Sequence, residues 1–133
     1  MTIFQLCNYK FKEIIPVGLK KMKTLGLINP IIEIDTLVHA ENMTVENWMT
    51  LLKDRINWIK QNLSPDAKIM INFRDFSDSM FKDITPNLQI TFFLGSLPEE
   101  IRPWGILFEE PTGNYLPEEL GKWCGGMYVC YWR

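Results

Sequence analysis

The stretch Lys68–Phe73, which reads KIMINF, is a short apolar run preceded by a turn, and this pattern predicts a buried β-strand. Two similar runs lie at nearly equal distances. Ile31–Val38 (IIEIDTLV) begins 37 residues earlier, and Trp104–Phe108 (WGILF) begins 36 residues later. A helical pattern follows each of the first two runs, so the chain repeats a strand-then-helix unit. We therefore predict an α/β fold of consecutive parallel strands joined by right-handed crossovers.

The segments around the first strand carry two helical patterns. Pro16 can occupy a first helical turn, and a short helix is expected to end at Gly26. After Thr44, a good N-cap, apolar residues recur every three or four positions as far as Leu63. This second pattern predicts a long helix that packs one face against the sheet.

The second half of the chain predicts two more helices. The polar stretch 74–78 is expected to be a loop, and a helix should run from Thr85 to about Leu94. Pro117 opens a last helix, which the pair Gly125-Gly126 is expected to end early. The remainder, 127–133, could then be a fourth strand or an aberrant end.

Composition limits the class of protein. The chain has 133 residues, 47% apolar and 23% charged, which fits a single α/β domain spanning 1–133. The net charge of −2 and the scattered basic residues give no reason to expect a nucleic-acid partner. The sequence has no secretory signal and no long apolar run, and its three cysteines lie far apart. We expect a cytoplasmic protein with reduced thiols and no membrane partner.

Acidic residues follow all three predicted strands: Asp35, Asp75, and the pair Glu109 and Glu110. The carboxyl ends of parallel strands meet at one edge of the sheet, where ligands of such folds bind. Carboxylates that converge there repel one another unless a cation is present, so we expect Mg²⁺ or Mn²⁺ at this edge. With His39 nearby, a transition metal is an alternative.

A structural interpretation competes with the metal site. Loops after strands are polar in every α/β protein, and their acids often cap the next helix or pair with a neighbouring cation such as Arg74. The sequence contains no serine-nucleophile elbow and no glycine-rich phosphate loop. We therefore expect no nucleotide cofactor.

The string Asn72-Phe73-Arg74-Asp75 resembles the Asn-x-Arg-Asp string of the metal-dependent lyases that include HMG-CoA lyase and isopropylmalate synthase. The strand-end strings at equal spacing look like part of the aldolase-type (β/α)8 barrel of that class. The resemblance implies that Asp75 is a metal ligand and that Arg74 steadies an enolate oxygen. Such a barrel needs about 250 residues, so the chain would be an incomplete barrel, a half-barrel that dimerises, or a small open parallel sheet.

Two functional hypotheses follow. In the first, the chain is a metal-dependent lyase or aldolase-like enzyme, or its inactive remnant, acting on a small-molecule substrate. Asp35, Asp75 and Glu109 hold the divalent cation, and Arg74 and Glu110 are the catalytic candidates. In the second, the chain is a non-catalytic interaction module or barrel fragment, and aromatic side chains near its end dock a partner: Trp123, Tyr128, Tyr131 and Trp132. A homo-oligomer is also possible.

Overall fold

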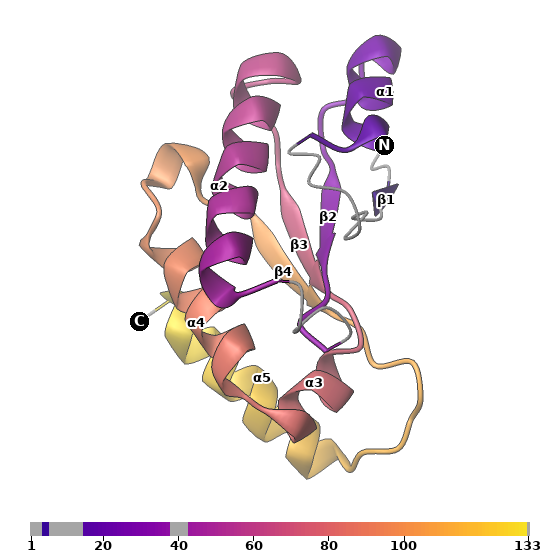
Figure 1. The fold of residues 1–133 in the computed structure, drawn as a ribbon, viewed down its shortest axis with the longest axis vertical. Coiled ribbons are helices and arrows are strands. Elements are labelled where there is room, and N and C mark those ends of the chain that lie inside the picture. The colour runs from indigo at the N-terminus through magenta and orange to yellow at the C-terminus, as the bar shows by residue number, and fades with distance from the viewer. Residues whose placement is uncertain (1–3, 6–14, 38–42, 133) are drawn as a thin grey trace.

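A computed structural model describes residues 4–5, 15–37 and 43–132. In these ranges the chain forms an open, parallel, four-stranded sheet whose strands follow chain order (Figure 1). The strands are β1 (Phe4–Gln5), β2 (Ile31–Ile34), β3 (Met70–Phe73) and β4 (Gly105–Phe108). The predicted succession of parallel strands is confirmed, and β1 and β4 form the two edges of the sheet.

The register of the sheet aligns side chains of the same kind across its strands. Ile32 pairs with Ile71, which in turn pairs with Ile106. Two residues further along, Ile34 pairs with Phe73, which pairs with Phe108. Successive side chains of a strand point to opposite faces, so these rows share one face. The β2 and β3 members of the rows are fully buried. This face is therefore the core face of the sheet.

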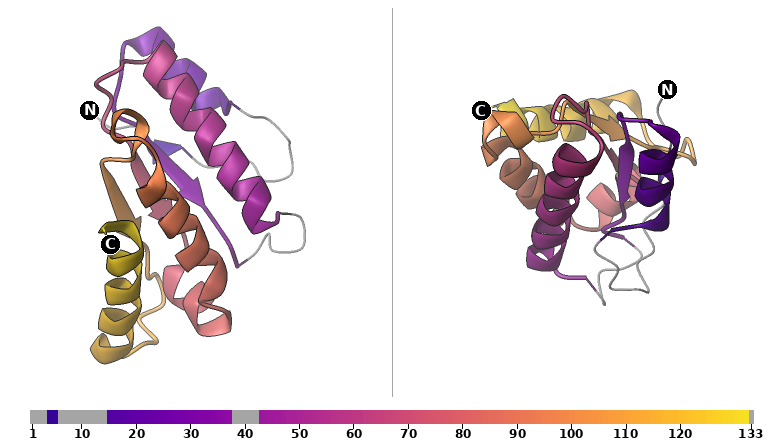
Figure 2. Two further views of the ribbon diagram at one scale, coloured as in Figure 1. Left: turned by 90° about the vertical axis from the view of Figure 1, so that its left-hand side faces the viewer. Right: turned by 90° about the horizontal axis from the view of Figure 1, so that it is seen from above.

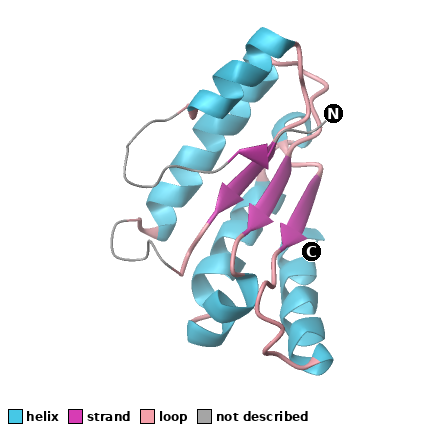
Figure 3. Cartoon of the chain, turned by 90° about the vertical axis from the view of Figure 1, so that its right-hand side faces the viewer, coloured by secondary structure: helices cyan, strands magenta, loops and turns pink. Residues whose placement is uncertain are grey.

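Three helices cover the core face. α2, α4 and α5 all lie on one side of the strands, as Figures 1 and 3 show from two directions. α4 and α5 run side by side (Figure 2). The helices are α1 (Val17–Leu25), α2 (Val45–Asn62), α3 (Phe76–Lys82), α4 (Thr85–Ser96) and α5 (Pro117–Trp132), with a 3₁₀ turn at Glu99–Ile101. None of the helices described is long and apolar enough to cross a bilayer.

The end signals of the first two helices act as predicted. α1 ends at Gly26, whose φ of 71° lies in the left-handed region that glycine adopts without a steric penalty. α2 begins after Thr44, and the Thr44 hydroxyl accepts a hydrogen bond of 3.1 Å from the backbone N–H of Asn47.

Two sequence expectations are wrong. The stretch 74–78 is not wholly a loop, because α3 begins at Phe76 and buries Phe76 and Met80 in the core. α5 does not end at Gly125-Gly126. It continues to Trp132, so 127–132 is helix and not a fourth strand.

Packing explains why α5 continues through two glycines that each cost about 1 kcal/mol in a helix. Met127 and Tyr131, one turn apart, are both buried. The Tyr131 hydroxyl also donates a hydrogen bond to the carbonyl of Pro103, just before β4. On the other side, Gly95 of α4 lies directly against the backbone of Tyr131. Tertiary contacts therefore outweigh the low helix propensity.

The close approach of α4 and α5 gives a prediction. A Cβ added at Gly95 would clash with the carbonyl oxygen of Tyr131 and lie 2.9 Å from its Cα, so Gly95→Ala should destabilise the protein by about 1–3 kcal/mol. Gly121 of α5 has open space around it, so Gly121→Ala should stabilise by up to about 1 kcal/mol. Urea unfolding followed by circular dichroism measures both changes, and equal effects of the two substitutions would contradict this packing.

Candidate functional site

The face of the sheet opposite the core helices carries polar side chains. In the shared register, Glu33 of β2 lies beside Asn72 of β3, one position away from the core-face rows. Asp35, Arg74 and Glu109 follow towards the carboxyl ends of the same strands. We define the carboxyl-edge cluster by six residues: Glu33, Asp35, Asn72, Arg74, Asp75 and Glu109.

Two polar contacts cross between strands in this cluster. Nη1 of Arg74 lies 3.2 Å from Oε1 of Glu33 in a salt bridge. The Glu33 side chain is 1% exposed and the Arg74 side chain 44%. Nδ2 of Asn72 donates a hydrogen bond of 3.1 Å to Oε2 of Glu109. Polar side chains thus link β2 to β3 and β3 to β4.

Burial raises the pKa of Glu33 above its ordinary value of 4.5. The positive charge of Arg74 and the amide of Asn72 act in the opposite direction, and the negative charge of Glu109 adds to the rise. The net rise means that loss of hydration outweighs the attraction to Arg74. Glu33 is therefore a buried acid whose charge the fold does not fully compensate.

Asp75 has an unusual backbone conformation and a perturbed acidity. Its φ of 47° makes it the non-glycine residue with a positive φ in the part of the chain that the structure describes. Its pKa is raised from 3.8, chiefly by burial and then by the negative charge of Asp35, while Arg74 lowers it. Asp75 precedes α3, yet its side chain makes no capping hydrogen bond there. A constrained conformation and a raised pKa in one residue are features that occur often at functional sites.

A hydrogen bond holds the loop after β2 against α4, and a second one joins α4 to α3. The Thr36 hydroxyl donates a 2.6 Å hydrogen bond to Oδ1 of Asn87 in α4, and Nδ2 of Asn87 donates one of 2.6 Å to the Ser79 hydroxyl of α3. Beside this network, Oδ1 of Asp35 accepts a hydrogen bond of 3.0 Å from the backbone N–H of Leu37. These bonds position one side of the carboxyl-edge cluster.

The structure places the predicted site residues in two groups. Asp35, Arg74, Asp75 and Glu109 come together, as the charge effects on Asp75 show. Glu110 does not join them. Its carboxylate accepts hydrogen bonds from Thr112 and from the backbone N–H of Gly113, and these bonds lower its pKa. Glu110 therefore organises the turn after β4, and its geometry gives no support to a catalytic role. His39 lies outside the described residues.

Sequence reasoning missed Glu33 and Asn72 as members of the site. Both are polar residues inside otherwise apolar strands, in the strings Ile-Glu-Ile and Ile-Asn-Phe. Alternation in a strand places such a residue on the face opposite its apolar neighbours. A polar residue within an apolar run was therefore the available signal.

The carboxyl-edge cluster has the donor atoms of a metal site but not the geometry. Its donors are carboxylate oxygens, the type that Mg²⁺ and Mn²⁺ take. Among residues 15–37 and 43–132, however, no three acidic, cysteine or histidine side chains lie close enough together to hold one ion. The described side chains therefore do not form a metal site in their present arrangement.

Comparison with protein-family models, with curated proteins and with solved structures gives no match to this chain.

The raised pKa of Asp75 gives a pH-dependent prediction. A carboxylate whose folded pKa lies above its unfolded value destabilises the fold at higher pH, and this cost disappears once the group is protonated in both states. Asp75→Asn should therefore raise stability near pH 7 by up to about 1 kcal/mol for a partly exposed group, and this gain should fade as the pH falls to 3.8 and below. Asn also tolerates the left-handed conformation.

Thermal unfolding between pH 3 and pH 8, a window around the ordinary value of 3.8, measures the effect. Asp66→Asn is the matched control, because Asp66 is exposed and precedes β3 at the opposite end of the sheet. A loss of stability in Asp75→Asn at neutral pH would contradict the assignment.

The Glu33–Arg74 pair gives a second prediction. Arg74→Met leaves a buried carboxylate without its cation, so unfolding at neutral pH should become easier by about 1–3 kcal/mol. Glu33→Gln in the same chain removes the buried charge and should recover at least half of that loss. Urea unfolding of the four chains of this double-mutant cycle gives the coupling energy, and purely additive effects would show that the pair is not coupled.

Proposed function

We propose that the carboxyl-edge cluster is the acid–base site of a lyase- or aldolase-like enzyme for a small carbonyl compound, or of its inactive descendant. Asp75 carries this proposal, because it combines a raised pKa and a left-handed backbone with a place beside Arg74. Ligands of parallel α/β sheets bind at the carboxyl ends of the strands, where this residue lies. The consecutive strand order β1-β2-β3-β4 is also the order of neighbouring strands in a (β/α)8 barrel.

Each residue has a defined role in this proposal. The carboxylate of Asp75 accepts a proton from the carbon next to the substrate carbonyl, and a raised pKa brings a carboxylate closer to the value that suits a general base near neutral pH. The electron pair of the broken C–H bond forms a carbon–carbon double bond to the carbonyl carbon, and the π pair of the C=O bond moves to the oxygen, which gives an enolate. The half-exposed guanidinium of Arg74 stabilises the negative oxygen. The salt bridge to Glu33 holds the Arg74 side chain in place.

A divalent cation is a candidate ligand of the carboxyl-edge cluster. The cluster has four carboxyl groups and one guanidinium, so its field favours a cation such as Mg²⁺ or Mn²⁺. Because no three side chains of the described residues converge on one point, we assign no step of the reaction to it.

Two measurements test the proposal. In D₂O, the methyl protons of pyruvate should exchange for deuterium faster with the protein than without it, as followed by proton NMR. Oxalate, a planar dianion that resembles the enolate of pyruvate, should raise the melting temperature. At about 100 times its dissociation constant the shift should be roughly 8–10 °C. Both measurements are made with and without millimolar Mn²⁺ or Mg²⁺.

Variants separate the roles. Asp75→Asn should abolish deuterium exchange yet keep the response to oxalate, whereas Arg74→Met should lose the response to oxalate. Asp66→Asn should behave as the unchanged protein in both tests. If the unchanged protein neither exchanges deuterium nor responds to oxalate under any metal condition, the cluster is not an acid–base site. A response to Mn²⁺ alone that Asp75→Asn removes would instead support a cation site at the same edge.

The interaction module is the second candidate function, and the aromatic side chains of α5 favour it in part. Tyr128 and Trp132 are exposed. Tyr131 is buried, and Trp123 is half-buried in a T-shaped contact with Tyr115. Two of the four aromatic residues expected to dock a partner are therefore available.

A further inference from the structure

The second half of α5 has no charged residue. From Trp123 to Trp132 it reads WCGGMYVCYW, and a helix that is apolar on all sides is normally buried on all sides. Only Met127 and Tyr131 are buried, whereas Tyr128, Val129 and Trp132 are 65%, 64% and 58% exposed. The outer face of α5 therefore has the composition of a buried surface.

The edge strand beside α5 has the same character. β4 reads GILF, without a charge or a proline, which are the usual means of preventing further pairing at a sheet edge. The N–H of Glu109 donates to Phe73 of β3, so by alternation the N–H and C=O groups of Ile106 and Phe108 point away from β3. Leu107 and Phe108 also have exposed side chains. In the described sheet, β4 is thus an unprotected edge.

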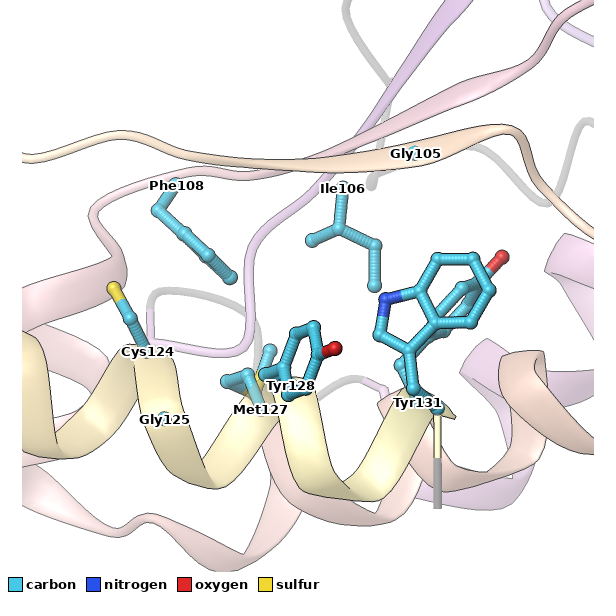
Figure 4. Close-up of a pocket in the computed structure, with 9 residues that line it drawn as sticks. Gly105, Ile106, Phe108, Cys124, Gly125, Met127, Tyr128 and Tyr131 are labelled. Carbon is cyan, nitrogen blue, oxygen red and sulfur yellow. The ribbon is translucent and has the colours of Figure 1, made fainter.

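The edge and the helix form one continuous surface. A groove of about 410 Å³ separates them, with Ile106 and Phe108 on one wall and Met127 and Tyr128 on the other. Figure 4 shows the two β4 side chains pointing towards α5 across this groove. We define the β4–α5 surface by its five exposed apolar side chains: Phe108, Tyr128, Val129 and Trp132, which lie on the α5 side, and Leu107, which lies beside Asn72 on the other face of the same edge strand.

We infer that the β4–α5 surface is the interface of a symmetric homodimer, in which β4 pairs antiparallel with β4 of a second copy. The inference is independent of the acid–base site. A twofold axis perpendicular to the sheet at Leu107 joins Ile106 to Phe108 of the partner subunit through the outward backbone groups. Because this axis is perpendicular to the sheet, the two α5 helices lie on the same face of the joined sheet. The outer face of each α5 then covers the outer face of the other.

The available area fits a second copy. With about 200 Å² for a large apolar residue, the exposed fractions of the five residues amount to roughly 500 Å² on each copy. Two copies together contribute about 1,000 Å², which is the lower limit for a specific interface, and the paired β4 backbones add to it. The surface is also free of charge, so bringing it against itself causes no electrostatic repulsion.

Pairing β4 with β1 of a second copy, which would close a barrel from two half-barrels, is less well supported. Among the described residues, Phe4 and Gln5 alone belong to β1, against four residues in β4. The β4–β4 arrangement pairs strands of equal length and uses the same surface on both copies, so it closes at two subunits.

A disulfide at the twofold axis tests the arrangement. Residues that face each other in a non-hydrogen-bonded antiparallel pair have Cα atoms about 4.5 Å apart, within the range that a disulfide spans. In a chain whose three native cysteines are alanine, Leu107→Cys should form a covalent dimer on mild oxidation, as seen on non-reducing gels. Leu25→Cys, which is also an exposed leucine but lies at the end of α1, should stay monomeric on the gel. The reverse result would overturn the inference.

Sedimentation velocity tests the helix side of the interface. The unchanged chain should associate as a dimer between roughly 1 and 200 µM, and Val129→Glu should weaken the dimer at least about tenfold. Leu25→Glu is the control, since Leu25 is 66% exposed and Val129 is 64% exposed. A monomer at every concentration, or equal weakening by both variants, would overturn the inference.

Amide hydrogen exchange gives a third measurement. In the dimer the N–H groups of Ile106 and Phe108 should be protected, and in Val129→Glu at low concentration they should exchange rapidly. The N–H of Glu109, which bonds within the monomer, should stay protected in both. Unprotected amides at both positions in the dimer would exclude pairing through β4.

Discussion

The parallel register of β2, β3 and β4 is the constraint on which the rest of the structure depends. Because side chains alternate along a strand, a slip of one residue would exchange the two faces of a strand. The observed register places Ile32 and Ile71 in one buried row beneath the helices. It thereby also places Glu33 beside Asn72 on the opposite face. The hydrophobic core and the polar cluster are two consequences of one alignment.

The polar cluster contains buried charge that is costly to fold. The raised pKa of Glu33 means that the attraction of Arg74 does not repay the loss of hydration. Apolar residues of similar size at these positions would be at least as stable, as is common for buried ion pairs. Asp75 adds a strained backbone to the same place. Raised acid pKa values and a constrained backbone in one cluster are features that occur often at functional sites.

The sequence predicts the elements whose signals are local. The apolar runs, the Thr44 cap and the Gly26 stop are signals of this kind, and the structure has these elements, with strands shorter than the predicted runs. The continuation of α5 could not be read in this way, because the contacts of Tyr131 with Gly95 and Pro103 come from distant parts of the chain.

The candidate site likewise depends partly on local signals and partly on contacts between distant residues. Parallel strands bring Asp35, Asp75 and Glu109 to one edge, as the sequence predicts. Whether an acid joins a site depends on its side-chain partners. Glu109 bonds to Asn72 across the strands, whereas its neighbour Glu110 bonds to its own turn. Sequence position alone could not separate these two residues.

The way in which two copies pair would decide how their polar clusters relate. Parallel closure of two half-barrels would bring both carboxyl edges to the same end, where they would line one shared pocket and share its negative charge. Antiparallel pairing through β4 places the two edges at opposite ends of a continuous sheet, because the strands of the two copies run in opposite directions. Each copy then keeps a complete and separate cluster, whose acids do not meet those of its partner. The proposed dimer thus covers the apolar face of α5 without adding negative charge beside Asp75, whose pKa is already raised by burial and then by the charge of Asp35.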